Sequence, residues 1–449
     1  MPGNSIIADA ANDDAALTPE VDAKRRAAIK GAFYSEFIDM FDIYLPVVVL
    51  SPVLAYFQPA HLDAATANIL GSLVFITTLL GRPIGAFLFG LIADRIGRRM
   101  ASIYSVAGFS VVTLLIALVP GYQTIGIASY LLLVGLRFID GIFLGGGYTG
   151  AHPLAIEYSK KHQRGLVGGF VMSAFPASYV AINLVATAVF ALVPLTGLDS
   201  PYAQWGWRIP FVIGAALAAV LALYYVYQVS ESEIWKVETK AGRDNQPLRE
   251  LWRGRSGRSL LQVLILMTGF WITQNMITIF LPSSLLLHTL HLSKLEISST
   301  LLVTYSLLVV SYIGAGVLGQ KIGRRRLFLI LGPLIATVGS ALLYVLASGE
   351  AMPLAVIIAL VCVLAILVTA PWGVLVTYIN ERFVTDVRAT GFGVGFSLSV
   401  IIPSFYAFYV NWLGHLFSAA LAPAVLLCIG GVIATLGAAM GPETRDVDL

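Results

Sequence analysis

Apolar segments long enough to cross a lipid bilayer follow one another along almost the whole chain. A transmembrane helix needs about 20 apolar residues, and twelve segments reach this length. They span 29–57, 66–93, 99–119, 124–157, 164–193, 207–229, 259–287, 295–320, 326–348, 352–379, 387–413 and 418–440. An open sheet would leave backbone groups unpaired in lipid. We therefore expect an all-α integral membrane protein with twelve transmembrane helices.

Composition supports this expectation. The chain is 58% hydrophobic and only 12% charged, whereas about a quarter of the residues of a soluble domain are charged. No phosphate-binding Gly-x-x-x-x-Gly-Lys-Ser/Thr motif is present, and the six histidines lack metal-ligand spacing. The sequence therefore predicts a protein that is not an enzyme, has no cofactor and no metal, binds no nucleic acid and has the lipid bilayer as its surroundings.

A short pattern of glycines and cations occurs twice. Gly90–Arg99 reads GLIADRIGRR, and Gly316–Arg325 reads GVLGQKIGRR, 226 positions later. A repeat at half the chain length indicates two homologous halves. We predict six-helix halves at 29–229 and 259–440, joined by a polar linker at 230–258. Residues 1–28, which lack the apolar core of a signal peptide, and 441–449 are predicted to be tails, the first of them disordered.

The distribution of cations predicts the orientation. Of the 28 Lys and Arg residues, 24 lie on the side that holds both termini and the even-numbered turns. Arg208 and Lys294 lie on the opposite side, and Arg82 and Arg137 lie within spans. Because cytoplasmic loops collect Lys and Arg, we expect both termini in the cytoplasm and the protein in the inner, or cytoplasmic, membrane.

Ionisable residues within the spans are the strongest functional signal. A charge near the bilayer centre costs at least about 2.5 kcal/mol, so such residues are paired or face water. All six of them lie in the first half of the chain: Glu36, Asp39, Asp42, Arg82, Arg137 and Asp140. With a helix rise of about 1.5 Å per residue, the charged residues of three helices are expected at a similar depth in the bilayer.

Two interpretations of this charge layer follow. In the functional one, a carboxyl group carries a proton; Asp39 is the first choice, then Asp42, Asp140 and Glu36. Arg137 and Arg82 would then bind either the deprotonated carrier or a substrate carboxylate, since the planar guanidinium suits carboxylates. In the structural one, the residues form a static ion-pair network that holds the helices together.

The second half offers neutral groups. Gln274 and Asn275 lie in the middle of the seventh span, near Trp271. Amides facing lipid would be costly, so we expect them to face a central cavity or to bond between helices. Trp372 and Tyr378 are further candidates for substrate contact, with plain packing as the alternative.

Small residues are frequent in the fourth span. Gly141, Gly145 and Gly150 lie within it. A nucleotide-binding loop would need a preceding strand, which the pattern does not offer. These glycines instead predict close approach of neighbouring helices.

Several of these motifs resemble those of a known family. The Gly90–Arg99 run resembles the loop signature of the major facilitator superfamily. Five further segments are similar to the metabolite:proton symporter family within it: Glu36–Asp39, Arg82–Gly85, Arg137–Gly141, Gly145–Tyr148 and Arg388–Gly391. Residues Pro442–Arg445 are similar to the tail of sugar porters. The chain departs from the symporter family at Gly147, where Glu is usual, and at Asp140, where Gln is usual.

The resemblance implies a monomeric secondary transporter that imports a small organic acid, such as a mono- or dicarboxylate or an aromatic acid, together with protons. A sugar, zwitterion or drug transporter is the alternative. It also implies a cytoplasmic gate that latches the halves. A second repeated pattern lies at the same turns: Glu157 precedes Arg164 by seven positions, as Glu381 precedes Arg388. The expected gate residues are Gly90, Asp94, Arg95, Gly97, Arg98, Glu157, Arg164, Glu381 and Arg388.

Overall fold

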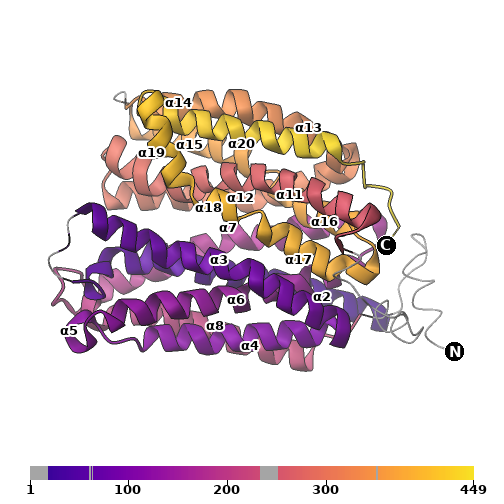
Figure 1. Cartoon of the computed structure of the whole chain (residues 1–449), viewed down its shortest axis with the longest axis horizontal. Helices are drawn as coiled ribbons and strands as arrows, with labels where there is room; N and C mark the ends of the chain where they lie inside the picture. The colour runs from indigo at the N-terminus through magenta and orange to yellow at the C-terminus, as the bar shows by residue number, and fades with distance from the viewer. Residues whose placement is uncertain (1–18, 60–61, 63, 233–250, 350–351, 449) are drawn as a thin grey trace.

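The helices form two bundles that lie side by side. The computed structural model describes residues 19–59, 62, 64–232, 251–349 and 352–448, and the regular structure within these ranges is helical throughout. The chain up to Tyr227 forms one bundle, drawn indigo to magenta in Figure 1, and the chain from Gly254 forms the other, drawn in orange and yellow. The two bundles thus correspond to the first and the second part of the chain.

The first bundle contains six spans. Its elements are α2 (Pro19–Leu45) with η1 (Pro46–Leu50) and η2 (Ser51–Tyr56), α3 (Ala64–Ile96), α4 (Arg98–Ala117), α5 (Tyr122–Ile125), α6 (Ala128–Glu157), η3 (Lys161–Gln163), α7 (Arg164–Leu192), η4 (Tyr202–Gly206) and α8 (Arg208–Tyr227). Helices α5, η3 and η4 are short connecting turns.

The second bundle repeats the arrangement. Its elements are α11 (Gly254–Asn275) with η5 (Met276–Thr289), α12 (Lys294–Ile322), α13 (Arg324–Leu334) with η6 (Ile335–Gly339) and α14 (Ser340–Ala347), α15 (Leu354–Thr369) with α16 (Trp372–Arg382), η7 (Thr385–Val387), α17 (Arg388–Leu398) with α18 (Ile401–Ser404) and α19 (Tyr406–Leu416), and α20 (Leu421–Met440).

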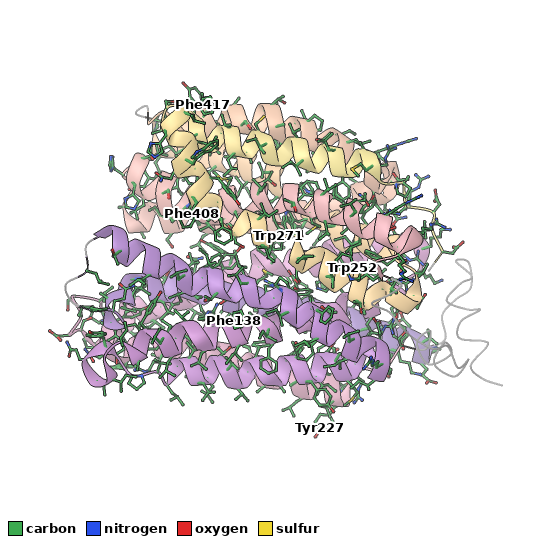
Figure 2. All side chains as sticks on the ribbon, viewed as in Figure 1. Phe138, Tyr227, Trp252, Trp271, Phe408 and Phe417 are labelled. Carbon is green, nitrogen blue, oxygen red and sulfur yellow. The ribbon has the colours of Figure 1, made fainter. Side chains whose placement is uncertain are left out.

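Most spans are apolar enough to cross a membrane. Ten helices of the described chain meet this condition by length and composition, and the pair Arg388–Ser404 and Tyr406–Leu416, bent by 40°, makes an eleventh. The remaining span is α2, which is less apolar because it buries Glu36, Asp39 and Asp42. Large apolar side chains such as Tyr227 point outward from the bundle (Figure 2), as expected of a surface that contacts lipid.

Two predicted boundaries differ from the structure. Helix α2 begins at Pro19 rather than at residue 29, so residues 19–28, predicted to be part of a disordered tail, are helical. Proline suits the first helical position, and the ion pairs Lys24–Glu20 and Arg26–Asp22 support the first turns. Helix α11 begins at Gly254, within the predicted linker. Residues 1–18 and 233–250 lie outside the described ranges.

Both repeated loops have the same backbone shape. Gly97 and Gly323 each have a φ of 108° and each precede a helix, α4 and α13 respectively. This conformation strongly favours glycine. The two loops lie at the end of the molecule where α2 begins and the described chain ends, on the right in Figure 1, and we call this the terminal end.

The glycines of α6 bring it close to α3. A methyl group at Gly141 or Gly145 would meet the backbone of α3 at Thr78 or Arg82. A methyl group at Gly150 would meet the carbonyl oxygen of Arg98 on α4. The predicted close helix contacts are therefore confirmed. They bring the charged residues of α3 and α6 near one another.

Candidate functional site

The predicted charge layer forms in the first bundle. Arg82 on α3 donates to Asp39 on α2 through Nη2, at 2.7 Å. Arg137 on α6 donates through Nη1 to Asp42 and to Asp140, each at 2.8 Å. All five side chains are buried. Charges from three helices thus lie close together, in agreement with the similar depth predicted for them, and Arg137 and Asp140 pair within α6.

A pocket lies between the two bundles beside this layer. Its lining comes from α2, α3 and α7 of the first half and from α11 and η5 of the second half. The lining residues are Met40, Ile43, Tyr44, Phe75, Leu79, Arg82, Phe175, Trp271, Gln274, Asn275, Thr278 and Ile279. Figure 2 shows Trp271 at the boundary between the bundles. A ligand held here would contact both halves at once.

Arg82 is the arginine that lines this pocket. Its Nη2 is bound to Asp39, but its Nη1 has no hydrogen-bond partner among the described residues. The guanidinium also lies 4.9 Å from the ring centre of Tyr148. Arg137 is not part of the lining and lies between two carboxylates instead. Of the two arginines proposed for substrate binding, the structure places Arg82 at the pocket.

The second half presents amides to the pocket, as the sequence suggested. Asn275 donates to the carbonyl oxygen of Pro403 at 2.9 Å. The side chain of Gln274 is buried, and neither its oxygen nor its nitrogen has a hydrogen-bond partner within the described ranges. Trp372 packs edge-on against Trp271, with ring centres 4.6 Å apart, and therefore lies one layer behind the lining.

Tyr378 has a different position from the one expected. Its hydroxyl faces the carbonyl oxygen of Pro442 at 3.4 Å, and its ring contacts Phe328, at the terminal end rather than at the pocket. Helix α16 turns this residue away from the boundary between the bundles. Hydropathy cannot predict whether an amphipathic aromatic side chain points toward the pocket or toward the terminal end.

The first span of each half changes its winding beside the pocket. Helix α2 gives way to π-helical η1 at Pro46, two residues after Tyr44. Helix α11 gives way to π-helical η5 at Met276, directly after Asn275. Such local departures from α-helical winding are frequent at functional sites. They occur at corresponding places in the two halves, on the helices that line the pocket.

Hydrogen bonds and ion pairs join the two halves at the terminal end. Arg388 on α17 donates to Glu157 on α6 at 2.9 Å, and Thr390 donates to Asp94 on α3. Arg98 donates to the carbonyl oxygen of Thr385 at 3.2 Å. Gly90 lies against Thr390, where a methyl group would be 3.0 Å from its Cα, so the glycine permits close approach. The terminal end is therefore closed.

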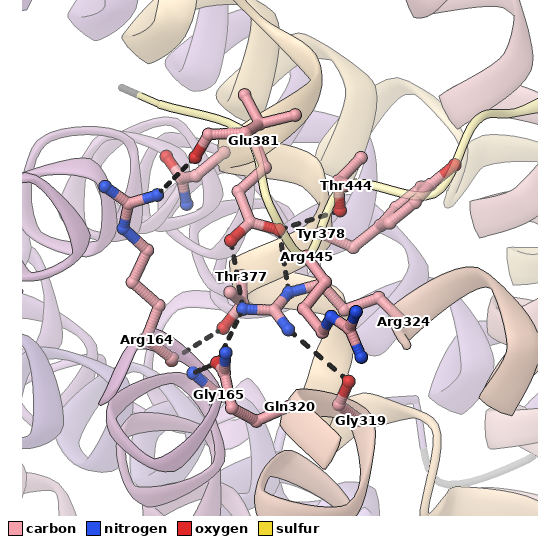
Figure 3. A network of polar contacts seen from close by, with 12 residues as sticks. Arg164, Gly165, Gly319, Gln320, Arg324, Thr377, Tyr378, Glu381, Thr444 and Arg445 are labelled. Carbon is pink, nitrogen blue, oxygen red and sulfur yellow. Dashed lines mark hydrogen bonds and ion pairs between the residues drawn. The ribbon is translucent and has the colours of Figure 1, made fainter. Parts of the chain in front are cut away.

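The second half contributes a related network (Figure 3). Arg324 lies 2.7 Å from Glu381, and its Nη2 donates to Gln320 at 2.9 Å. The backbone N–H of Gly165 in the first half donates to Gln320 at 3.0 Å. Gln320 is the repeat counterpart of Asp94, and each therefore accepts a hydrogen bond from the opposite half. The repeat thus keeps a contact between the halves at both places, although glutamine replaces aspartate in the second copy.

Two expected gate arginines have other surroundings. Arg164 donates to the carbonyl oxygen of Val447 at 2.7 Å, and nearby Lys161 lies 2.9 Å from Asp448. The last residues of the second half thus contact the first half. Arg95 is exposed at the end of α3 and lies outside the network that joins the halves.

Sequence reasoning missed a third repeated element. Glu231 accepts from the backbone N–H groups of Arg98 and Arg99, and Ser232 donates to Glu157 at 2.7 Å. Burial raises the pKa of Glu231 above its ordinary value, against the opposing effect of these N–H groups.

Glu443 and Thr444 take the same places in the second half. Glu443 accepts from the N–H groups of Arg324 and Arg325, and Thr444 donates to Glu381 at 2.7 Å. In the sequence, this element is visible only as a Glu-Ser dipeptide after the last helix of the first half and a Glu-Thr dipeptide after the last helix of the second half. Two residues are too short a pattern to be recognised as a repeat.

Comparison with known proteins agrees with this architecture. The family model described as Major Facilitator Superfamily matches residues 32–405. The chain belongs to the Major Facilitator Superfamily. It is therefore a multi-pass secondary transporter and not an enzyme, with the twelve-helix fold predicted.

Individual relatives are transporters of several compounds. The chain is 31% identical to the alpha-ketoglutarate permease of Escherichia coli K12, over 88% of this chain and 89% of that protein. It is 26% identical to the proline/betaine transporter of the same organism, over 95% and 85% respectively. Among solved structures it is similar to the proton:xylose symporter XylE, with a TM-score of 0.72, 20% identity and coverage of 94% and 97%.

Both departures of this superfamily member from the symporter pattern lie on α6. Asp140 is one of the two carboxylates bound to Arg137. At Gly147, where the resemblance leads one to expect a carboxylate, an added methyl group would lie 3.5 Å from Ser35 and 3.7 Å from Ser105. The chain therefore has an acid beside Arg137 and no side chain at position 147, next to Ser35 and Ser105.

Proposed function

We propose that this protein is a proton-coupled symporter that takes up a small organic acid by alternating access. The observation that carries the proposal is the state of Arg82. This buried guanidinium lines a pocket shared by both halves, and its Nη1 forms no hydrogen bond of good geometry among the described residues, although Tyr148 lies beside the guanidinium. Buried donors are rarely left unpaired, and a carboxylate is the acceptor that best fits a guanidinium.

The same contact suggests how a proton couples to the substrate. Asp39 neutralises Arg82 when it is ionised. Once Asp39 takes up a proton, Arg82 loses its counter-charge, and a substrate carboxylate can replace it. An anion and a proton then bind as a neutral pair, which lowers the cost of moving both through the membrane interior.

The second half supplies the remaining contacts in this proposal. Gln274, Asn275 and Thr278 offer neutral hydrogen-bonding groups to the pocket, and the interiors of the second-half spans carry no charge. A neutral polar group on the substrate, such as a keto or hydroxyl oxygen, fits this wall. A rocking motion of the two halves would expose the pocket to each side in turn.

The distribution of cations supports the proposed direction of transport. We place the terminal end in the cytoplasm, because 24 of the 28 Lys and Arg residues belong to that side. Separation of Arg388 from Glu157 and of Thr390 from Asp94 would open the pocket to the cytoplasm. An inward proton gradient would then drive uptake.

A zwitterion is the second candidate for the substrate. Tyr44, Phe75, Phe175 and Trp271 line the pocket, and aromatic faces attract alkylammonium groups. Proline, betaine and α-ketoglutarate, which appear in the names of two relatives, all carry a carboxylate. Arg82 would bind that group in either case.

The test is uptake into proteoliposomes that contain the full chain. Labelled α-ketoglutarate, proline, glycine betaine and xylose are offered with and without an inward proton gradient. We expect gradient-dependent accumulation of a carboxylate, abolished by a protonophore. Accumulation of xylose alone, or carboxylate uptake that ignores the gradient, would contradict the proposal.

A further inference from the structure

A glutamate and a histidine form a buried pair between the charge layer and the closed terminal end. Glu36 lies one helical turn before Asp39 on α2, toward the terminal end. His152 lies on α6, between Asp140 and the gate residue Glu157. The Nε2 atom of His152 is 3.2 Å from a carboxylate oxygen of Glu36, and both side chains are fully buried.

Neither member of this pair has another strong partner. Within the described ranges, Glu36 makes no ion pair with a lysine or an arginine, and neither side chain forms a hydrogen bond of good geometry, either with the other or with a third group. Arg82 and Arg137 are occupied by aspartates. His152 is therefore the group beside Glu36 that can provide a positive charge.

This isolation fixes the proton content of the pair. An ionised Glu36 beside a neutral imidazole would be an unpaired buried charge, which is very costly. An imidazolium beside a neutral carboxyl group would be equally costly. The pair is stable with one proton, either on the carboxyl group or on the imidazole, and in both states its net charge is zero.

Other charged and titratable groups around the pair come from four helices. Asp39 on α2, Arg82 on α3 and Tyr312 on α12 lie within electrostatic range of Glu36. Tyr148 on α6 has its ring centre 6.2 Å from that of His152. Asp39 and Arg82 bind each other, so they add little net charge near the pair.

A residue of the opposite half covers His152. The ring of Phe392 on α17 packs edge-on against the imidazole, with ring centres 5.5 Å apart. Helix α17 also carries Arg388 and Thr390, which join the halves at the terminal end. A movement of α17 that breaks those contacts would also carry Phe392 away and let water reach His152.

We propose that Glu36 and His152 are a proton-transfer pair that carries protons from Asp39 to water at the terminal end when Phe392 moves away. This inference rests on the proposed proton coupling and adds the exit route. It assigns a role to His152, and it gives Phe392 the role of a seal that opens together with the gate.

The steps balance in protons. The O–H bond of the protonated Asp39 breaks, and the proton bonds to Glu36, either directly or through a water molecule. In the same step the imidazolium of His152 releases its proton to water, the acceptor. The pair thus changes from an ionised Glu36 beside an imidazolium to a neutral carboxyl group beside a neutral imidazole, and it holds one proton throughout. Histidine suits this step because its ordinary pKa lies near neutrality.

The experiment compares two transport modes of reconstituted full-length protein. Accumulation driven by a proton gradient requires net proton release, whereas counterflow exchange at equal pH requires only movement of the loaded pocket. The labelled probe is whichever of α-ketoglutarate, proline and glycine betaine the parent protein accumulates. The variants are His152→Asn and Glu36→Gln, and His162→Asn, an exposed histidine near the terminal end, is the matched control.

We expect His152→Asn and Glu36→Gln each to lower gradient-driven accumulation at least about tenfold, a typical effect of removing a positioned proton-transfer group. Counterflow should persist at close to the parent rate, which also shows that the variants fold. Equal loss of both modes, or unchanged accumulation, would overturn the proton-transfer role alone. If the parent shows no gradient-driven accumulation, the proposed function fails together with this inference.

Discussion

The ion pair between Glu157 and Arg388 offers a quantitative test of the gate. Glu157 belongs to the first half and Arg388 to the second, and their 2.9 Å contact joins the halves at the closed terminal end. The change Glu157→Gln keeps the shape of the side chain and removes its charge. A charge-assisted hydrogen bond contributes about 1.5–3 kcal/mol. Because glutamine can still accept a weaker bond, we take the lower value.

A loss of about 1.5 kcal/mol from the closed state changes the closed-to-open ratio about tenfold. The assay is the distance distribution between spin labels at His162 in the first half and Val384 in the second, both exposed near the gate. Cys362 and Cys428 are first replaced by serine so that the labels react at the chosen sites. The ratio of the long-distance to the short-distance population should rise about tenfold.

The second half contains a matched control. Glu381 is the repeat counterpart of Glu157, but its closest partners, Arg324 and Thr444, both belong to its own half. Glu381→Gln therefore makes the same chemical change without removing a direct ion pair between the halves. It should lower thermal stability while changing the distance distribution much less. An equal shift in both variants, or none in Glu157→Gln, would refute this description of the gate.

Two further predictions concern substrate binding and pH. Arg82→Lys keeps the charge but loses the planar guanidinium group, so the KM for the transported carboxylate should rise at least about tenfold. An unchanged KM would show that Arg82 does not bind the substrate. Burial raises the folded-state pKa of Glu231, so the parent loses stability as pH rises through the ordinary carboxyl pKa toward the raised value. Glu231→Gln lacks this loss, so melting curves should increasingly favour the variant as pH rises from about 4 to 7; a pH-independent difference would contradict the effect of burial.

The fold was accessible from the sequence because the bilayer restricts the choice of structure. Twelve apolar segments and a repeated loop leave few arrangements. The start of α2 was misplaced because residues 19–28 are polar, and only their ion pairs at helical spacing indicate a helix.

The site was accessible only in part. The acids and arginines in the spans stood out because charges are rare in lipid, and they do meet. Tyr378 could not be placed, because an amphipathic aromatic residue fits several environments. His152 gave no signal, because a single histidine in an apolar span gains meaning only from Glu36, a distant residue in the sequence. The direction in which Arg82 and Arg137 point also depends on tertiary contacts.

The central claim is that Asp39 couples proton movement to substrate movement by releasing Arg82. Simultaneous recording of labelled carboxylate and of internal pH in proteoliposomes tests it most directly, with the parent compared to Asp39→Asn. The parent should carry protons inward together with the label. Asp39→Asn, which resembles the permanently protonated state, should exchange the label across the membrane without moving protons or accumulating it. Proton-coupled accumulation by Asp39→Asn at the parent level would contradict the account.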